Sequence, residues 1–318
     1  MEIFQLTLDQ MLTMFIFIVF GYLLRKTHIL PESSSVTLSK LETYFLLPVL
    51  NFYTWMSNCT ISTIKENSVL IIYGTGLILV AVAVSFPLSR LFVRKADTPA
   101  LDYQRNIYKY ALAFGNYGSM GNYIVLGIWG AEAFFRYSMF TFGISLISST
   151  WGIFILIPKS ESEKQTLSVI LKRIFTPPVV ALLAGMPAGL LQIKDYIPTA
   201  FMTVLSDGSA CMGPINMLLA GVVIGGFDLK ELLTRKKIYA VTFLRLIAIP
   251  AVVTALLSLM GASKEIIPLA FIAFATPIGL GTVVYPAAYG GDVKTGASMT
   301  MISHTLSVIT IPLMYLLL

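Results

Sequence analysis

Two long apolar segments of the sequence are interrupted at corresponding points, 160 residues apart. The first interruption is FGNYGSMGN at residues 114–122, and the second is ATPIGLGT at residues 275–282. A shift of 160 residues places Gly121 on Gly281. Glycine and proline disfavour a continuous helix, because glycine costs backbone entropy and proline lacks an N–H group. The pattern therefore predicts two broken helices, one in each half of the chain.

Composition places these segments in a membrane. The chain has 318 residues, of which 56% are hydrophobic and 12% are charged, whereas about 25% of residues are charged in a typical soluble domain. A run of about 20 apolar residues is long enough to span a bilayer. We therefore predict an all-α polytopic membrane protein with ten transmembrane helices. The expected spans are 6–24, 37–57, 68–92, 106–129, 134–157, 168–191, 201–226, 238–260, 266–289 and 296–318.

Positive charge is distributed unevenly among the loops that join these spans. Counted along the chain, the odd-numbered loops hold 17 Lys and Arg residues and the even-numbered loops hold 4. Loops rich in Lys and Arg stay in the cytoplasm, so we expect a cell-membrane protein with both termini on the extracytoplasmic side. This topology accounts for the net charge of +6, which therefore does not indicate nucleic-acid binding. Residues 1–10 lack Lys and Arg, so the first span is expected to stay in the mature protein.

Five spans in each half make the second half inverted relative to the first. We place the first five-helix repeat at residues 1–160 and the second, inverted repeat at residues 161–318. Each half also carries a proline shortly before an asparagine in its second span. These pairs are Pro48 with Asn51 and Pro214 with Asn216. A proline of this kind is either part of a site or, as we favour, an ordinary kink that neighbouring groups satisfy.

The two interruptions have the chemistry of an anion site. A break exposes unpaired N–H groups at the start of its second half-helix and unpaired carbonyls at the end of its first. The N–H ends attract anions, and neither break has a basic residue nearby. Broken helices at matching positions are typical of a transporter's binding site, although close helix packing is the alternative for the glycines. The candidate binding residues are Asn116, Gly118, Gly121, Asn122, Thr276, Pro277, Gly279, Gly281, Thr282, Asn51 and Asn216.

Few ionisable residues fall inside the expected spans, and such residues are functional by default because burying them costs free energy. The candidates for proton or ion coupling are Asp207, His304, Arg245 and Glu42. For Arg245 we weigh pairing, with Asp207 as one partner, against snorkelling to the interface. His304 could titrate near neutral pH or be a satisfied polar residue in helix packing. The carbonyl ends of the breaks also leave room for a coupling cation. No metal site or cofactor is expected, and the two cysteines are interpreted as unpaired thiols.

Three motifs resemble the auxin efflux carrier family. They are Asn116-x-Gly118-x-x-Gly121, Tyr289-Gly290-Gly291-Asp292 and Ser303-x-Thr305-x-Ser307-x-x-Thr310-x-Pro312. The resemblance covers the whole chain. It implies that helices 4 and 9 cross and that Asn116 contacts a carboxylate. It also implies a static scaffold of helices 1–2 and 6–7, which would form a homodimer contact, and a moving transport unit of helices 3–5 and 8–10.

The chain departs from this family pattern in two places. Where many members have a proline two residues after the second glycine of the first motif, this chain has Asn122 and then Tyr123. It also lacks the long central loop of many plant members. It therefore looks closer to the prokaryotic branch, whose members are proposed to move malonate, malate and similar acids.

These observations favour a secondary carrier of small organic anions that works by alternating access in the lipid bilayer. The alternatives are a cation-coupled carrier of neutral solutes, a channel and an intramembrane enzyme. A channel would show rings of charge or a filter sequence, and neither is evident. The sequence at residues 289–292 only partly resembles an aspartyl protease motif, and no zinc-protease or Walker motif is present. An enzyme is therefore not expected.

Overall fold

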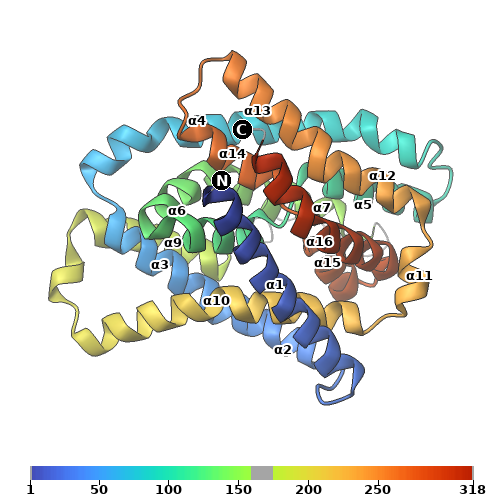
Figure 1. The fold of residues 1–318 in the computed structure, drawn as a ribbon, viewed down its shortest axis with the longest axis horizontal. Coiled ribbons are helices and arrows are strands. Elements are labelled where there is room, and N and C mark those ends of the chain that lie inside the picture. Colours follow the sequence, from blue (N-terminus) through green and yellow to red (C-terminus); the bar gives the residue numbers. More distant parts are fainter. Residues whose placement is uncertain (1, 159–174, 317–318) are drawn as a thin grey trace.

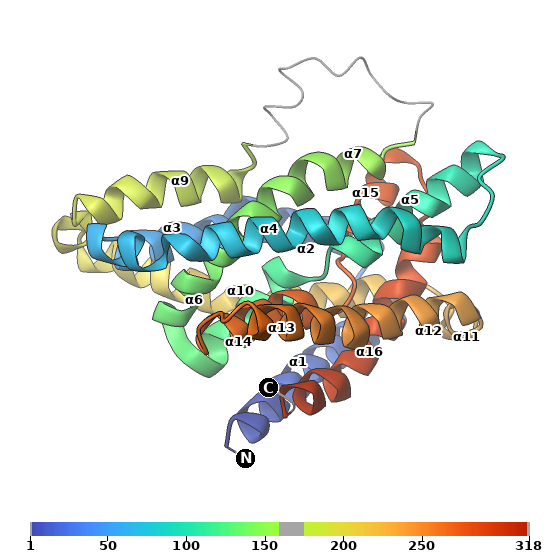
Figure 2. The same ribbon diagram turned by 90° about the horizontal axis from the view of Figure 1, so that it is seen from above.

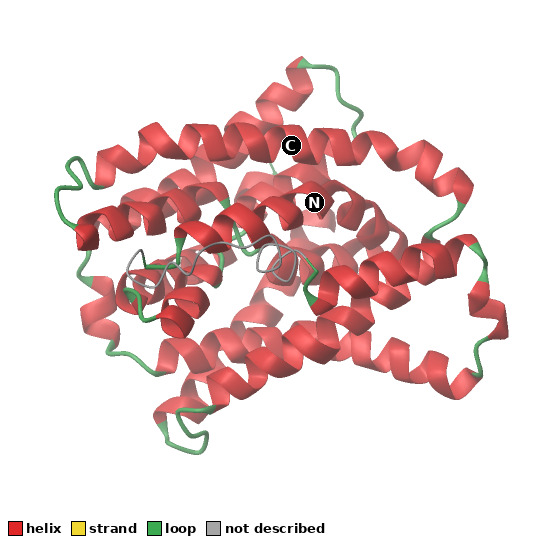
Figure 3. Cartoon of the chain, turned by 180° about the vertical axis from the view of Figure 1, so that it is seen from behind, coloured by secondary structure: helices red, strands yellow, loops and turns green. Residues whose placement is uncertain are grey.

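The computed structural model describes residues 2–158 and 175–316, and every regular element in these ranges is helical (Figure 3). Helices satisfy all backbone groups within one segment, which a bilayer requires. The elements of the first half are α1 (Glu2–Lys26), α2 (Ser34–Leu41), η1 (Glu42–Leu46), α3 (Leu47–Asn58), α4 (Ile61–Phe92), α5 (Pro99–Ala113), η2 (Tyr117–Gly121), α6 (Asn122–Ile147), η3 (Ser148–Gly152) and α7 (Ile153–Ile155). Those of the second half are α9 (Pro177–Leu190), η5 (Ile193–Tyr196), α10 (Thr199–Gly225), α11 (Leu229–Leu233), α12 (Lys236–Phe243), η6 (Leu244–Ala248), α13 (Ile249–Leu259), α14 (Ile266–Ala275), α15 (Gly281–Tyr289) and α16 (Val293–Tyr315).

Several helical runs have the length and hydropathy of a membrane span. In the described residues, 6 runs qualify by length and composition, and two shorter apolar helices accompany them. The six are Phe4–Lys26, Ile61–Phe92, Tyr117–Ile155, Thr199–Gly225, Lys236–Leu259 and Val293–Tyr315, and the shorter two are α9 and α14. The fold is thus a polytopic helical membrane protein. The count of ten spans stays a prediction, and the expected span 168–191 begins outside the described residues.

One of these runs joins two expected spans. The spans expected at 106–129 and 134–157 share the helical run from Tyr117 to Ile155. The chain turns within this run at Gly130, whose φ of 78° and ψ of −171° are non-helical and accessible to glycine because it has no Cβ. The backbone therefore changes direction between the two expected spans without a loop.

Four helical turns are wider than an α-helix. These π-helical turns are η1, η2, η3 and η6. Two of them, η1 and η6, come directly before Pro48 and Pro250, which occupy the first turn of the next helix. A proline has no N–H for the regular ladder, so a wider turn fits there. Turns of this kind often mark functional sites, and these four carry residues of the site described below.

The helices pack in two groups, which also contact each other through α1 and α16. Helix α1 packs on α10 and α3 packs on α9, whereas α4 packs on α5 and α6, and α15 packs on α16 (Figure 1). Glycines allow close contacts in both groups, as membrane helices require. A Cβ at Gly74 of α4 would overlap the backbone oxygen of Phe140 in α6, and one at Gly21 of α1 would overlap that of Leu218 in α10. The start of α1 and the end of α16 lie close together on one side of the molecule (Figures 1 and 2).

Candidate functional site

The two interruptions lie directly against each other. Gly115 and Ile278 form an isolated antiparallel bridge. The Asn116 N–H donates to the Pro277 carbonyl at 2.7 Å, and the Gly279 N–H donates to the Phe114 carbonyl at 3.4 Å. Backbone groups that leave the helical ladder at one break are therefore satisfied by the other break.

Local sequence accounts for each break. Helix α14 ends at Ala275, and Thr276 is extended with ψ of 146°, as the residue before a proline prefers. The two segments also approach closely at their glycines. A Cβ at Gly279 would lie 3.0 Å from the Gly115 carbonyl oxygen, and one at Gly115 would overlap the Thr276 hydroxyl and the Arg245 guanidinium. Side chains larger than hydrogen would therefore hold the breaks apart.

The second half-helices begin at a shared cavity of about 290 Å³. Among the described residues, the N–H groups of Tyr117, Gly118 and Ser119 on one side have no hydrogen-bond partner. On the other side, the N–H groups of Leu280 and Gly281 also have no hydrogen-bond partner among the described residues. These are the amides that a helix start leaves unsatisfied and that carry its partial positive charge. The cavity therefore presents amide donors from two helix starts.

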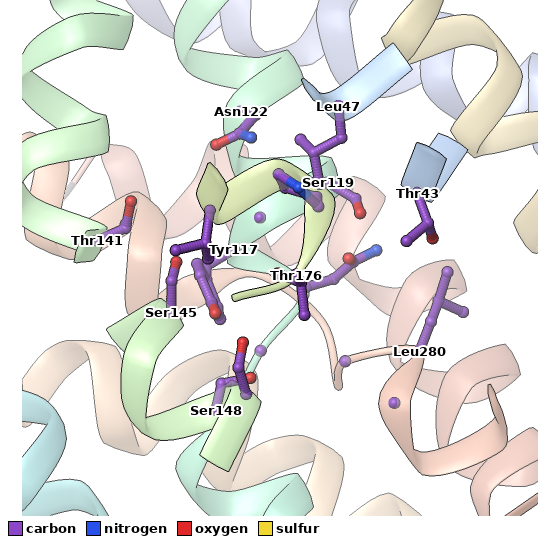
Figure 4. Close-up of a pocket in the computed structure, with 18 of the residues that line it drawn as sticks. Thr43, Leu47, Tyr117, Ser119, Asn122, Thr141, Ser145, Ser148, Thr176 and Leu280 are labelled. Carbon is purple, nitrogen blue, oxygen red and sulfur yellow. The ribbon is translucent and has the colours of Figure 1, made fainter. Parts of the chain in front are cut away.

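The wall of this cavity combines polar and apolar side chains but is uncharged. Its described lining residues include no Asp, Glu, Lys, Arg or His. Hydroxyl groups come from Ser138, Thr141, Ser145 and Ser148 on α6 and η3, with Tyr117 beside them (Figure 4). Figure 4 shows Tyr117, Ser145 and Ser148 on one side of the space and Thr43 and Leu280 on the other. The opposite wall comes from the η1–α3 segment and from the first turns of α9. Its residues are Thr43, Leu47, Asn51, Thr176, Pro178, Val179 and Leu182.

Asn116 lies in the wall at the first break and is held by His304. The His304 Nδ1 lies 2.8 Å from the Thr300 carbonyl, which can only accept a hydrogen bond, so Nδ1 carries the proton. In the neutral ring Nε2 is then an acceptor, and the Asn116 side-chain amide donates to it at 3.1 Å. This network fixes the orientation of the amide. The second N–H of the Asn116 amide remains for a ligand in the cavity.

Four other predicted binding residues line the same cavity besides Asn116 and Gly118. Asn122, Gly279 and Gly281 come from the two breaks, and Asn51 comes from α3. The Asn122 amide makes no hydrogen bond to another described residue, whereas Asn51 donates to the Pro178 carbonyl at 3.1 Å. Asn51 therefore ties α3 to α9 as well as lining the wall.

The remaining predicted binding residues lie away from the cavity surface. Thr276 and Thr282 are fully buried, and their hydroxyls donate to carbonyls of their own segments, Ala273 and Gly279. The Pro277 carbonyl accepts the hydrogen bond from the Asn116 N–H, and Gly121 packs against the Tyr137 hydroxyl. Asn216 is fully buried in α10, and neither of its amide atoms has a partner among the described residues.

The ionisable candidates have separate positions. The Ser119 hydroxyl of η2 donates to the Glu42 carboxylate of η1 at 3.1 Å, so Glu42 lies beside the cavity. Asp207 is exposed on α10. Arg245 is 1% exposed and donates to backbone carbonyls. Snorkelling is therefore wrong for Arg245, because its guanidinium is enclosed, and the pairing with Asp207 is not formed.

Sequence reasoning missed the hydroxyl stripe on α6 and η3. Its members at 138, 141, 145 and 148 are spaced by three or four residues, which places them on one face of a helix. Hydroxyl residues at this spacing in an apolar span indicate a polar face on the helix, which could have identified this wall of the cavity. Tyr117 and Tyr285, which also line the cavity, gave no comparable pattern.

The described residues contain no group of three or more His, Cys, Asp or Glu side chains that could hold a metal ion. Cys59 is buried and Cys211 is exposed, and both are free thiols, as expected. The chemistry of the site therefore comes from amides, hydroxyls and helix ends.

Comparison with known proteins assigns the chain to a family. A model of the membrane transport protein family matches residues 6–315, which is nearly the whole sequence. Comparison with individual curated proteins gives no match. The family is one of membrane transporters, which agrees with the apolar helices and the broken pair. The chain therefore belongs to the membrane transport protein family, the family of the auxin efflux carriers.

Proposed function

We propose that this membrane transporter is a secondary carrier of small organic anions, with mono- or dicarboxylates as substrates. The observation that carries the proposal is the pair of helix starts with unpartnered amides facing one cavity. Each such end attracts an anion by up to about 2 kcal/mol when partly buried. The second Asn116 N–H adds a donor, and Ser145 and Ser148 add hydroxyls. The hydroxyls of Ser138 and Thr141 donate to carbonyls of their own helix. A cavity of about 290 Å³ lies at the small end of the range for ligand sites, which suits a small acid.

The mechanism we propose is alternating access of the elevator type. Helices α1, α2, α3, α9 and α10 would form the scaffold, and α4–α7 with α12–α16 would form the moving unit. Support comes from the packing of α1 on α10 and of α3 on α9, and from a cavity that lies between the two groups. The Glu42–Ser119 hydrogen bond joins the two groups across this boundary. In this scheme the substrate would lie between inverted repeats, both termini would face the extracytoplasmic side of a cell membrane, and the scaffold would form a homodimer contact.

A carrier of neutral polar solutes is the second candidate. The hydroxyl-lined wall could bind such solutes, and the Glu42 carboxylate next to Ser119 is unfavourable for an anion. The two candidates differ in whether the ligand's negative charge contributes to binding.

Matched acid and amide ligands separate these candidates. The purified protein would be heated with malonate, malate or a monocarboxylate, and in parallel with the amide of each acid. We expect stabilisation by at least one acid, because a ligand that binds the folded state raises its melting temperature. Uptake of that acid into proteoliposomes, with pH and sodium gradients imposed separately, would then establish transport. Equal stabilisation by an acid and its amide would contradict anion recognition.

A further inference from the structure

Arg245 lies behind the cavity, at the opposite ends of the broken helices. It belongs to η6 and is 1% exposed. Its Nη1 donates to the carbonyls of Leu112 and Ala113 at 3.4 and 3.3 Å. Its Nε and Nη2 donate to the carbonyls of Thr276 and Ala273, both at 3.3 Å. The first two carbonyls end α5 and the second two end α14, so one guanidinium bridges the carbonyl ends of both first half-helices.

The charges at this point balance. A helix carries the equivalent of about −0.5 elementary charge at its carbonyl end, so the two ends together carry about −1. Arginine stays protonated in proteins and supplies +1. No acidic side chain forms an ion pair with Arg245 among the described residues. Its guanidinium carbon also lies 5.9 Å from the centre of the Phe274 ring. The carbonyl ends are therefore the counter-charge of Arg245.

The chain is shaped to admit this side chain. A Cβ at Gly115 would overlap the Arg245 guanidinium, so the glycine of the first break provides the space for the charge. In transporters with discontinuous helices, carbonyl ends of this kind coordinate the coupling cation. Here the same carbonyls already accept hydrogen bonds from a cation that is part of the chain.

We propose that Arg245 is a built-in replacement for a coupling metal cation at the carbonyl ends of the two broken helices. Arg245 is thus a positioning residue: it holds the two breaks together so that their amide ends face the cavity. Substrate binding then needs no sodium ion at this point. The inference deepens the proposed anion carrier and rests on it wherever transport is measured.

The test compares sodium with choline for the native protein and for two variants. For the native protein we expect the melting temperature and the rate of carboxylate uptake to be the same in both salts. Arg245→Ala removes the charge and the donor to the carbonyls of Leu112, Ala113 and Thr276, while the Ala273 carbonyl keeps the Thr276 hydroxyl, so uptake should fall by at least about tenfold. Sodium, or guanidinium at a low and non-denaturing concentration, should restore part of the stability of this variant. Arg245→Lys keeps the charge and should stay independent of sodium.

Two results would overturn the inference. One is a native protein whose melting temperature or uptake falls when sodium is replaced by choline. The other is a purified Arg245→Ala protein that melts at one temperature in sodium, guanidinium and choline. If Arg245→Ala cannot be purified in any of these salts, the test uses the native protein and Arg245→Lys. A melting temperature or uptake rate that depends on sodium in either protein contradicts the proposal. The melting-temperature measurements need no substrate. A protein that moves no carboxylate but shows the rescue would therefore refute the proposed function and retain this inference.

Discussion

The two broken helices correspond in sequence, but they contribute differently to the site. The first break supplies side chains to the cavity, through Asn116, Asn122 and Ser119. The second supplies two glycines, Gly279 and Gly281, and the apolar side chain of Leu280 (Figure 4), while its threonine hydroxyls bond to their own segments. Two breaks that correspond in sequence therefore present different groups to one cavity.

The two ends of each break also differ. The amide ends face the cavity and have no partner among the described residues, whereas the carbonyl ends are saturated by Arg245. One side of the crossing is thus left available for a ligand, and the other is closed by the chain itself. The two sides of the crossing are therefore chemically different, although the two breaks correspond in sequence.

The largest effect is expected from Gly115→Ala. The new methyl group would overlap both the Thr276 hydroxyl and the Arg245 guanidinium. It would also lie 2.9 Å from the Thr276 backbone oxygen, which a change of side-chain rotamer cannot relieve. Overpacking of this kind costs about 1–3 kcal/mol or more in the free energy of unfolding, so the melting temperature should fall clearly. Gly118→Ala is the matched control, because a Cβ there meets no atom within 4 Å. Equal melting temperatures for the two variants would show that the close approach at Gly115 is not needed.

The next largest effect is expected on carboxylate affinity, when a side chain of the first break is removed. Asn116→Ala removes the amide that faces the cavity and should weaken binding of the carboxylate by about 1–3 kcal/mol, or about 5- to 150-fold. Thr282→Val is the control in the second break: its affinity should stay within about twofold, because that hydroxyl bonds to its own segment. Titration of both purified variants with the stabilising acid measures this. A larger loss in Thr282→Val than in Asn116→Ala would reverse the assignment.

His304 tests how the Asn116 amide is oriented. Glutamine at position 304 can still accept a hydrogen bond through its carbonyl oxygen, whereas leucine cannot. We therefore expect His304→Gln to bind nearly as well as the native protein and His304→Leu to approach the affinity of Asn116→Ala. If both variants bind normally, the contact between Asn116 and His304 does not position the site.

Much of this arrangement could be predicted from local sequence. The broken helices and the membrane location follow from glycine, proline and apolar run length, which act over a few residues. The role of Asn116 as a carboxylate contact came from the family resemblance and stays a prediction. The partners of Arg245 and His304 could not be predicted, because Arg245 contacts Ala113, 132 residues away, and His304 contacts Asn116, 188 residues away. Thr276 and Thr282 had the right chemistry for a ligand, but hydroxyls in a helical segment readily bond to a carbonyl three or four residues earlier. The direction of such a side chain is set by tertiary packing.

The smallest effect, and the most specific, concerns the boundary between the two helix groups. Glu42→Gln keeps an acceptor for the Ser119 hydroxyl but removes a carboxylate beside the cavity. A deprotonated Glu42 repels an anion in the cavity, so the native affinity for a carboxylate should fall as the pH rises and Glu42 loses its proton. Glu42→Gln should bind a few-fold more tightly at alkaline pH and lose this pH dependence, with an unchanged melting temperature. Ser119→Ala is the control, because it breaks the hydrogen bond but keeps the charge, so the pH dependence should remain. A Glu42→Gln protein with the native pH profile would show that this carboxylate does not act on the anion, and that the first break recognises its ligand without a contribution from the scaffold side.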